Sequence, residues 1–100
     1  MIIAEITVIP IGTKTPGVNK YVAKAVDELK RLGLNPEVTA MGTIFEAEDF
    51  SLILKAFKAV HESVFEQGAE RVVTTLTIDE RRDKEATIKQ KMLSVTSVLH

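Results

Sequence analysis

Residues 37–48 read EVTAMGTIFEAE, and this stretch decides the fold. Apolar and polar side chains alternate on both sides of Gly42, as they do in strands that bury one face. Glycine suits a tight turn because it adopts backbone conformations that other residues avoid. The stretch therefore predicts a β-hairpin, with strands at 37–41 and 43–48 joined at Gly42.

A helix is predicted on each side of this hairpin. Gly33 is placed to end the first helix, and one apolar stripe recurs every three or four positions before it: Val18, Val22, Ala25, Val26, Leu29 and Leu32. After the hairpin, Asp49 or Ser51 can cap a second helix that closes at Gly68. The apolar stripe of this second helix is expected to consist of Phe50, Ile53, Phe57, Val60 and Val64.

Strands are predicted outside both helices, at residues 2–11 and 71–79, and a last helix at 84–99. The order β-α-β-β-α-β-α contains no linker, so residues 1–100 are expected to form one domain. Two right-handed β-α-β crossovers around one hairpin fold most simply into a ferredoxin-like α+β structure. We therefore expect a four-stranded antiparallel sheet, two helices on one face and an extra C-terminal helix.

The composition excludes several classes of function. The chain has 13 basic and 14 acidic residues and no block of like charge, so neither nucleic acid nor a membrane is an expected partner. It has no cysteine, which excludes disulfides, thiolate metal sites and thiol nucleophiles. The apolar start lacks a basic leader, and no apolar run reaches the roughly 20 residues of a spanning helix. We expect a cytoplasmic protein.

Catalytic and metal-binding patterns are lacking in the sequence as well. His61 lies beside an apolar helical stripe and His100 is the last residue, so no pair of histidines has metal-ligand spacing. The serines show neither a triad pattern nor a nucleophile elbow. We predict no catalytic residue, no metal site and no cofactor.

The faces of the predicted sheet differ in character. The inward face is expected to carry Ile2, Ala4, Ile6, Val8, Val38, Ala40, Phe45, Ala47, Val72, Leu76 and Ile78. The opposite face, here called the open face, is expected to carry Ile3, Glu5, Thr7, Ile9, Thr39, Met41, Ile44, Glu46, Val73, Thr75 and Thr77.

An open face of this composition would be an unusually large exposed apolar patch, so we expect another subunit to cover it. Its glutamate and threonine side chains would then line a partly desolvated space that suits a cationic, hydrogen-bonding ligand. Solvated, β-prone surface residues would produce the same alternation equally well.

Three stretches together resemble the small thiamine-binding protein family: EITVIPIG at 5–12, MGTIFE at 41–46 and IDERRD at 78–83. The resemblance implies a ferredoxin-like domain that assembles as dimers and then tetramers, with ligand sites at subunit contacts. It implies thiamine or its hydroxymethylpyrimidine moiety as the ligand, and no catalytic activity. The site residues it implies are Glu5, Thr7, Met41, Gly42, Thr43 and Glu46.

The predicted hairpin bears on two candidates, Thr39 and Thr43. Thr39 joins the other candidates because alternation places it on the open face. Alternation counted back from Glu46 turns Thr43 inward, so a ligand contact of Thr43 depends on how the hairpin turn frees it.

The charged run at residues 79–83 leaves an alternative open. It favours a regulatory or structural oligomer that binds an inorganic ion or a protein partner, although such runs are commonly solvated connections. An acylphosphatase-like enzyme on the same fold would need an arginine in the first loop, which offers only Lys14.

Overall fold

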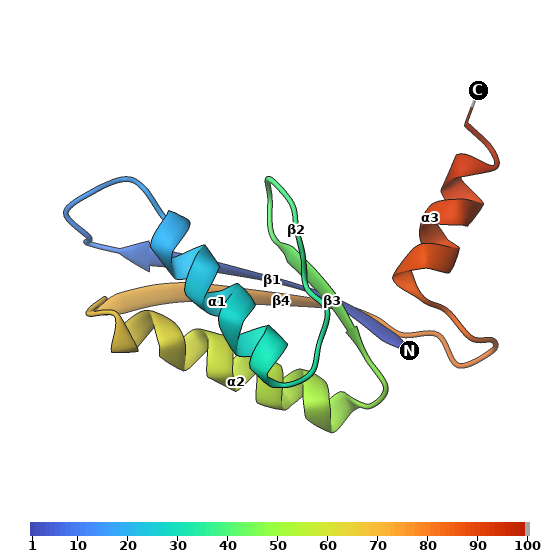
Figure 1. Cartoon of the computed structure of the whole chain (residues 1–100), viewed down its shortest axis with the longest axis horizontal. Helices are drawn as coiled ribbons and strands as arrows, with labels where there is room; N and C mark the ends of the chain where they lie inside the picture. The colour runs from blue at the N-terminus through green and yellow to red at the C-terminus, as the bar shows by residue number, and fades with distance from the viewer. Residues whose placement is uncertain (100) are drawn as a thin grey trace.

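The computed structural model describes residues 1–99, and His100, considered above as a metal ligand, lies outside them. The predicted α+β architecture is confirmed. The elements in chain order are β1 (Ile2–Ile11), α1 (Asn19–Arg31), β2 (Glu37–Val38), β3 (Thr43–Ala47), α2 (Phe50–Glu66), β4 (Arg71–Asp79) and α3 (Ile88–Thr96). The antiparallel strands form one sheet in the order β2-β3-β1-β4, and α1 and α2 lie together on one face of it (Figure 1).

The central strand β1 is paired unequally on its two sides. On one side β4 accompanies it from Ile3 to Ile11. On the other side β3 accompanies it only from Ile2 to Ile6, where Ile6 lies opposite Thr43. The second half of β1 therefore has a neighbouring strand on one side only.

The core lies between the sheet and the two long helices. The inward residues of β1 and β3 are buried as predicted, and they meet Leu29 of α1 and the buried face of α2. Tyr21 of α1 is also buried at 3% exposure, which the sequence pattern did not predict. The core cluster includes Ile2, Ala4, Ile6, Val8, Phe45, Ala47, Ile53, Ala56, Val60 and Val64.

The prediction of a strand over residues 37–41 is wrong in its second half, because β2 ends at Val38. The Thr39 hydroxyl donates to the Gly42 carbonyl (2.8 Å) and accepts from the Met41 and Gly42 amides (3.2 and 3.1 Å). These bonds hold residues 39–42 in a turn, since a threonine side chain competes with the strand ladder for backbone groups. Val38 is 59% exposed and Ala40 is exposed as well. The prediction that both side chains are buried against the helices is therefore wrong.

The start of α2 follows the prediction, but its apolar surface is divided differently. Asp49 caps the helix by accepting from the Leu52 amide at 2.8 Å. Phe50 is 47% exposed and does not belong to the buried stripe. The buried stripe consists of Ile53, Ala56, Val60, Ser63 and Val64.

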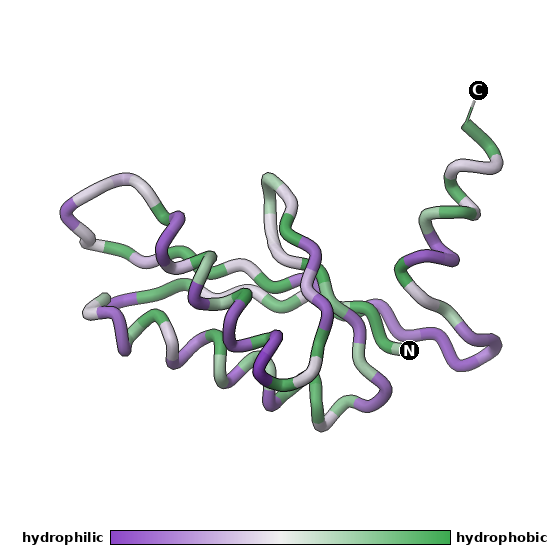
Figure 2. Tube along the Cα trace, viewed as in Figure 1, coloured by the Kyte–Doolittle hydropathy of each residue, from purple (hydrophilic) through white to green (hydrophobic). Residues whose placement is uncertain are grey.

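Helix α3 is shorter than predicted, and it starts beside the sheet but projects away from the sheet and the long helices (Figure 1). It has no buried residue, and apolar side chains along it are exposed to solvent, with Met92 at 59% and Val95 at 46%. The connection from β4 is a continuous hydrophilic stretch, whereas hydrophobic residues recur along α3 (Figure 2). Among the described residues, no helix combines the length and the apolar character needed to cross a membrane.

Candidate ligand-binding site

A cleft opens where the β2–β3 hairpin parts from β1. The β1–β3 ladder stops at Ile6 and Thr43, while β1 continues to Ile11. The two strands of the hairpin are paired at Glu37–Ile44 and Val38–Thr43. The hairpin then rises away from β1 (Figure 1). The edge of β1 beyond Ile6 is therefore left beside the hairpin turn and the first turns of α1.

The turn at the tip of the hairpin packs directly onto β1. A Cβ placed on Gly42 would lie 2.9 Å from Thr7 Cγ2 and 3.0 Å from Glu5 Cγ. Contacts below 3.0 Å between carbon atoms are repulsive, so only glycine lets the turn approach Glu5 and Thr7 this closely. The glycine thereby brings three of the predicted site residues together.

The cleft has the size of a small-molecule site. Its volume is about 480 Å³, within the range of roughly 300–1,000 Å³ that is common for such sites. We call it the hairpin cleft. Its lining residues are Glu5, Ile6, Thr7, Val8, Ile9, Val18, Val22, Ala25, Thr39, Ala40, Met41, Gly42, Thr43 and Val60.

Glu5 gives the hairpin cleft its charge. It is the one charged residue among the lining residues within the described chain. Glu5 is half-buried and makes no hydrogen bond or ion pair with residues 1–99. A carboxylate without a partner beside aliphatic side chains attracts a cation, because the attraction between opposite charges strengthens when water is displaced.

The hairpin cleft brings together six of the predicted site residues, but two of them differ from the others. Thr43 is 4% exposed and points inward, as alternation indicated. The Thr39 hydroxyl is occupied by the three turn hydrogen bonds described above. Met41, by contrast, is 82% exposed at the tip. Thr39 and Thr43 therefore shape the cleft, whereas Glu5, Thr7 and Met41 offer free side-chain groups to it.

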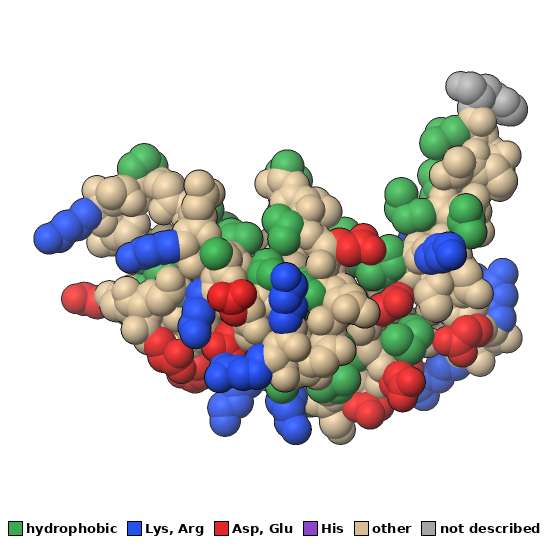
Figure 3. Space-filling model, in the orientation of Figure 1, with side chains coloured by type: hydrophobic (Ala, Val, Ile, Leu, Met, Phe, Trp, Pro, Cys, Tyr) green, Lys and Arg blue, Asp and Glu red, His purple; other side chains and the backbone are tan. Residues whose placement is uncertain are grey.

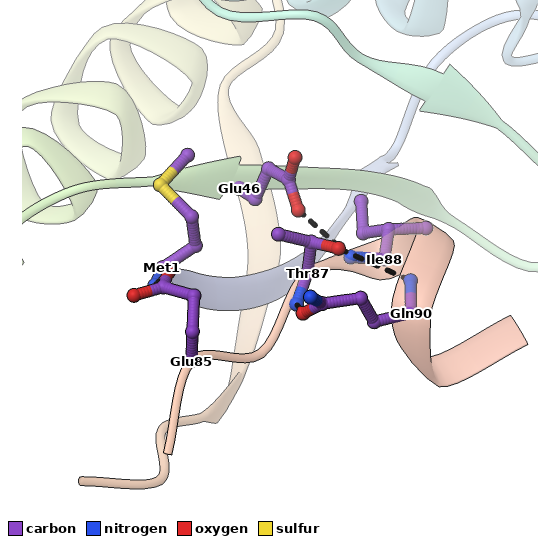
Figure 4. Close-up of polar contacts among 6 residues, drawn as sticks. All are labelled: Met1, Glu46, Glu85, Thr87, Ile88 and Gln90. Atoms are coloured by element: carbon purple, nitrogen blue, oxygen red, sulfur yellow. Dashed lines mark hydrogen bonds and ion pairs between the residues drawn. The ribbon is translucent and has the colours of Figure 1, made fainter. Parts of the chain in front are cut away.

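Glu46, the seventh predicted residue, lies outside the hairpin cleft. Its Oε2 accepts a hydrogen bond from the Ile88 amide at 2.8 Å (Figure 4). Thr87 and Gln90 complete this helix start with a capping box. A carboxylate at a helix N-terminus is stabilising because it satisfies a free amide and opposes the helix dipole. Glu46 thus holds the start of α3 against β3.

The sequence did not indicate the contribution of α1 to the cleft. Val18 and Val22 were predicted as members of a core stripe, but Val18 is 37% exposed and Val22 half-buried, and both line the cleft wall. Ile9 of β1, 54% exposed, lies there as well. Val18 and Val22 line the cleft because of where the hairpin lies. The local sequence pattern holds no information about that position.

The charged run at residues 79–83 is largely neutralised by its own members. Arg81 donates to both carboxylate oxygens of Asp83, and Arg82 donates to Glu80 at 3.0 Å. The Arg81 guanidinium lowers the pKa of Asp83 to about 2 by these hydrogen bonds. Both guanidinium groups are therefore already partnered, and this arrangement gives little support to an anion site. Within residues 1–99, no group of three or more acidic or histidine side chains is placed to hold a metal ion.

A second cavity, of about 710 Å³, lies between the sheet and α3. Charges of both signs line it, including Asp79, Arg81, Lys84 and Lys91, and Lys91 Nζ lies 2.5 Å from Asp79 Oδ2. It exists because α3 projects away from the sheet, so its walls depend on one helix that has no buried residue. The hairpin cleft, in contrast, is built on the core strand β1.

Fold and cleft together define the class: a ferredoxin-like α+β protein with an acidic cleft beside its central strand. The thiamine-binding protein family matches residues 4–96 of the chain. The UPF0045 protein of Methanothermobacter thermautotrophicus is 48% identical over 95 residues, which cover 95% of this chain and 96% of that protein. The UPF0045 protein YqgV of Bacillus subtilis is 41% identical and covers 99% and 98%. The chain belongs to the thiamine-binding protein family.

Solved structures agree with this assignment. The crystal structure of MJ1052 from Methanocaldococcus jannaschii has a TM-score of 0.87 and 44% identity, and the match covers 97% of both chains. TM0486 of Thermotoga maritima, for which a role in thiamine biosynthesis or salvage has been suggested, has a TM-score of 0.76 and 26% identity over 94% of this chain and 97% of that one.

Proposed function

We propose that this protein binds thiamine or its hydroxymethylpyrimidine moiety in the hairpin cleft and does not turn the ligand over. The observation that carries the proposal is the Glu5 carboxylate in the cleft wall, which has no partner among residues 1–99. Membership of the thiamine-binding protein family supports the identity of the ligand.

The chemistry of the cleft suits such a ligand. Thiamine carries a cationic thiazolium ring, which a half-buried carboxylate stabilises. It also carries an aminopyrimidine ring, which needs hydrogen-bonding groups and an apolar surface. Thr7 supplies a hydroxyl, while Ile9, Val18 and Val22 supply aliphatic walls. Among the residues that line the cleft, no histidine, lysine or serine is present to act as a base or nucleophile, which favours binding over catalysis.

We further propose that another copy of the chain covers the open face and completes the site. The Cα radius of gyration is 14.7 Å, larger than the roughly 13 Å of a compact 100-residue domain. Exposed hydrophobic side chains follow α3 (Figure 3), and Ile9 and Val73 of the open face are 54% and 44% exposed. Apolar surface of this kind is stabilised when a second subunit removes it from water.

Calorimetry and thermal shift with thiamine and hydroxymethylpyrimidine test the binding role. Glu5→Gln keeps the shape of the side chain and removes its charge, so thiamine should bind roughly tenfold or more weakly to this variant. Hydroxymethylpyrimidine lacks the cationic ring, so its affinity should fall much less.

Glu46→Gln is the matched control, because Glu46 is also a half-buried carboxylate of the sheet but lies outside the cleft. Its affinity for thiamine should equal that of the unmodified chain. The proposal is wrong if millimolar thiamine and hydroxymethylpyrimidine give neither heat nor thermal shift. The proposed position of the site is wrong if Glu46→Gln weakens thiamine binding and Glu5→Gln does not.

A further inference from the structure

A third cavity lies at the end of the molecule opposite α3, where the loop after β1 meets the end of α2 (Figure 1). Its volume is about 370 Å³, and its walls are residues 11–15, Lys20 and Tyr21 of α1, and residues 67–70. We call it the loop cavity. It shares no lining residue with the hairpin cleft. The loop cavity is therefore a separate feature of the fold.

The hydroxyl of Tyr21 points to a ligand in the loop cavity. Tyr21 is only 3% exposed, and its hydroxyl makes no hydrogen bond with residues 1–99. No unbonded side-chain polar atom of the described chain is sealed from solvent, so this hydroxyl reaches open space. Of the three cavities, Tyr21 lines the loop cavity alone. Because an unpaired polar group in a buried side chain is costly, a ligand that accepts from this hydroxyl is favoured.

The side chains that line the loop cavity carry more positive than negative charge. Lys14 and Lys20 line it, and neither makes an ion pair with residues 1–99. Lys20 Nζ lies 5.0 Å from the centroid of the Tyr21 ring, so an ammonium group lies beside that tyrosine. Glu70 is the one acidic lining residue in the described chain, and it is exposed to water. The cavity therefore attracts an anion.

The start of α1 adds to this attraction. Helix α1 has no side-chain cap and no acidic residue in its first turn. The first amides of a helix lack partners within the helix, and they give its N-terminus a partial positive charge. Lys20 and Tyr21 belong to this first turn. The positive end of the helix therefore lies beside the two side chains that line the cavity.

The loop after β1 supplies further hydrogen-bonding groups. Gly12 turns the chain at the end of β1 with a φ of 81°, a conformation that favours glycine. The Thr13 hydroxyl donates to the Thr15 carbonyl at 2.8 Å and folds the loop back on itself. The Thr15 hydroxyl makes no hydrogen bond with residues 1–99 and belongs to the cavity lining. The loop thus adds one hydroxyl and the Lys14 ammonium to the groups that face an anion.

We propose that the loop cavity binds a phosphate group, either as inorganic phosphate or as the phosphate of a small ester. Two ammonium groups and two hydroxyls donate in several directions, which suits the many oxygens of a phosphate better than the two of a carboxylate. Charge-assisted hydrogen bonds of this kind are short and strong. The volume lies at the lower end of the range for small-molecule sites, which leaves room for a small ester.

Isothermal titration calorimetry with inorganic phosphate and with glycerol 3-phosphate tests the site. Lys14→Gln and Lys20→Gln each remove one positive charge, so each should weaken the binding of both probes roughly tenfold. The matched control is Lys30→Gln, because Lys30 is an exposed lysine of the same helix that lies outside the cavity. Its affinity for both probes should equal that of the unmodified chain. Tighter binding of glycerol 3-phosphate than of inorganic phosphate would identify an ester as the ligand.

Tyr21→Phe distinguishes a ligand contact from a structural role. Since the hydroxyl makes no bond within residues 1–99, its removal should leave the melting temperature unchanged when phosphate is absent. Millimolar phosphate should raise the melting temperature of the unmodified chain. The rise should be smaller for Tyr21→Phe, whose affinity should fall roughly tenfold with the loss of a hydrogen bond to a charged group. Sodium chloride at the same ionic strength corrects for general screening.

Three results would overturn the proposal. The first is the absence of heat with both probes at millimolar concentration. The second is equal affinity for phosphate in Lys14→Gln, Lys20→Gln and Lys30→Gln. The third is a Tyr21→Phe variant that has a lower melting temperature without phosphate and binds phosphate as tightly as the unmodified chain.

The phosphate site goes beyond the proposed function, and the two can be tested separately. Glu5 lies in the hairpin cleft and not in the loop cavity. Glu5→Gln should therefore keep its full affinity for phosphate while its affinity for thiamine falls. Lys14→Gln should keep its affinity for hydroxymethylpyrimidine while its affinity for phosphate falls. A failure of either ligand to bind thus leaves the other site standing.

Discussion

The two borders of the sheet are formed by strands of very different length. At one border, β2 has two residues, and the hairpin that carries it bends away from the central strand. At the other, β4 has nine residues and follows the central strand along nearly its whole length. The short border leaves a cleft of small-molecule size, whereas the long border leaves a continuous row of unpaired backbone groups. The length of the outer strand therefore decides whether the central strand is fully paired or borders a cleft.

The two acidic residues of the sheet repeat this contrast on a smaller scale. Glu5 and Glu46 are both half-buried. Glu5 lies in the hairpin cleft and has no partner in the described part of the chain, but Glu46 accepts a hydrogen bond from the start of α3. Identical side chains thus have different roles, because α3 returns to one of them from 42 residues away.

The largest expected effect is the loss of stability when a core side chain of β3, next to the short border, is truncated. Phe45 of β3 is 0% exposed, so Phe45→Ala should lower the free energy of unfolding by roughly 3–5 kcal/mol. Leu76 of β4 is only half-buried, so Leu76→Ala should cost about 1 kcal/mol. Urea denaturation measures both.

A smaller effect is expected at the turn of the short border. In Gly42→Ala the added methyl group meets Thr7 Cγ2 at 2.9 Å, so the turn or the side chains of β1 must move. Overpacking of this kind should cost roughly 1–3 kcal/mol and should weaken thiamine binding, because Glu5 is displaced. Gly17→Ala is the control, since an added methyl group there meets no atom within 4 Å. Its stability should change by less than about 0.5 kcal/mol.

The smallest effect is expected just beyond the long border, at the exposed pair of Arg81 and Asp83. The pKa of Asp83, about 2, is below the roughly 3.9 of an unfolded aspartate. The pair of Arg81 and Asp83 therefore stabilises the folded state above pH 4, and this stabilisation is lost as the pH falls toward 2. The melting temperature of Asp83→Asn should lie slightly below that of the unmodified chain at pH 7, and the two melting temperatures should become equal near pH 2. A difference in melting temperature that persists near pH 2 would show that Asp83 stabilises the fold in another way.

The sequence by itself determined the order of the elements, the fold and the inward face of β1. These features follow from local periodicity and from turn and cap residues such as Asp49 and Gly33, whose effects reach only a few positions along the chain. Residue-by-residue resemblance also named five of the lining residues: Glu5, Thr7, Met41, Gly42 and Thr43. Whether these residues bind the ligand stays a prediction.

The tertiary structure alone decided where those side chains act. Thr39 ended β2 early because its hydroxyl was close enough to bond the turn. Val18 and Val22 became walls of a cleft because the hairpin parts from β1 at Thr43. Glu46 became a helix cap because the start of α3 lies beside it. Each of these outcomes depends on contacts between segments that are distant in sequence or on the path of a turn, and periodicity carries no information about either.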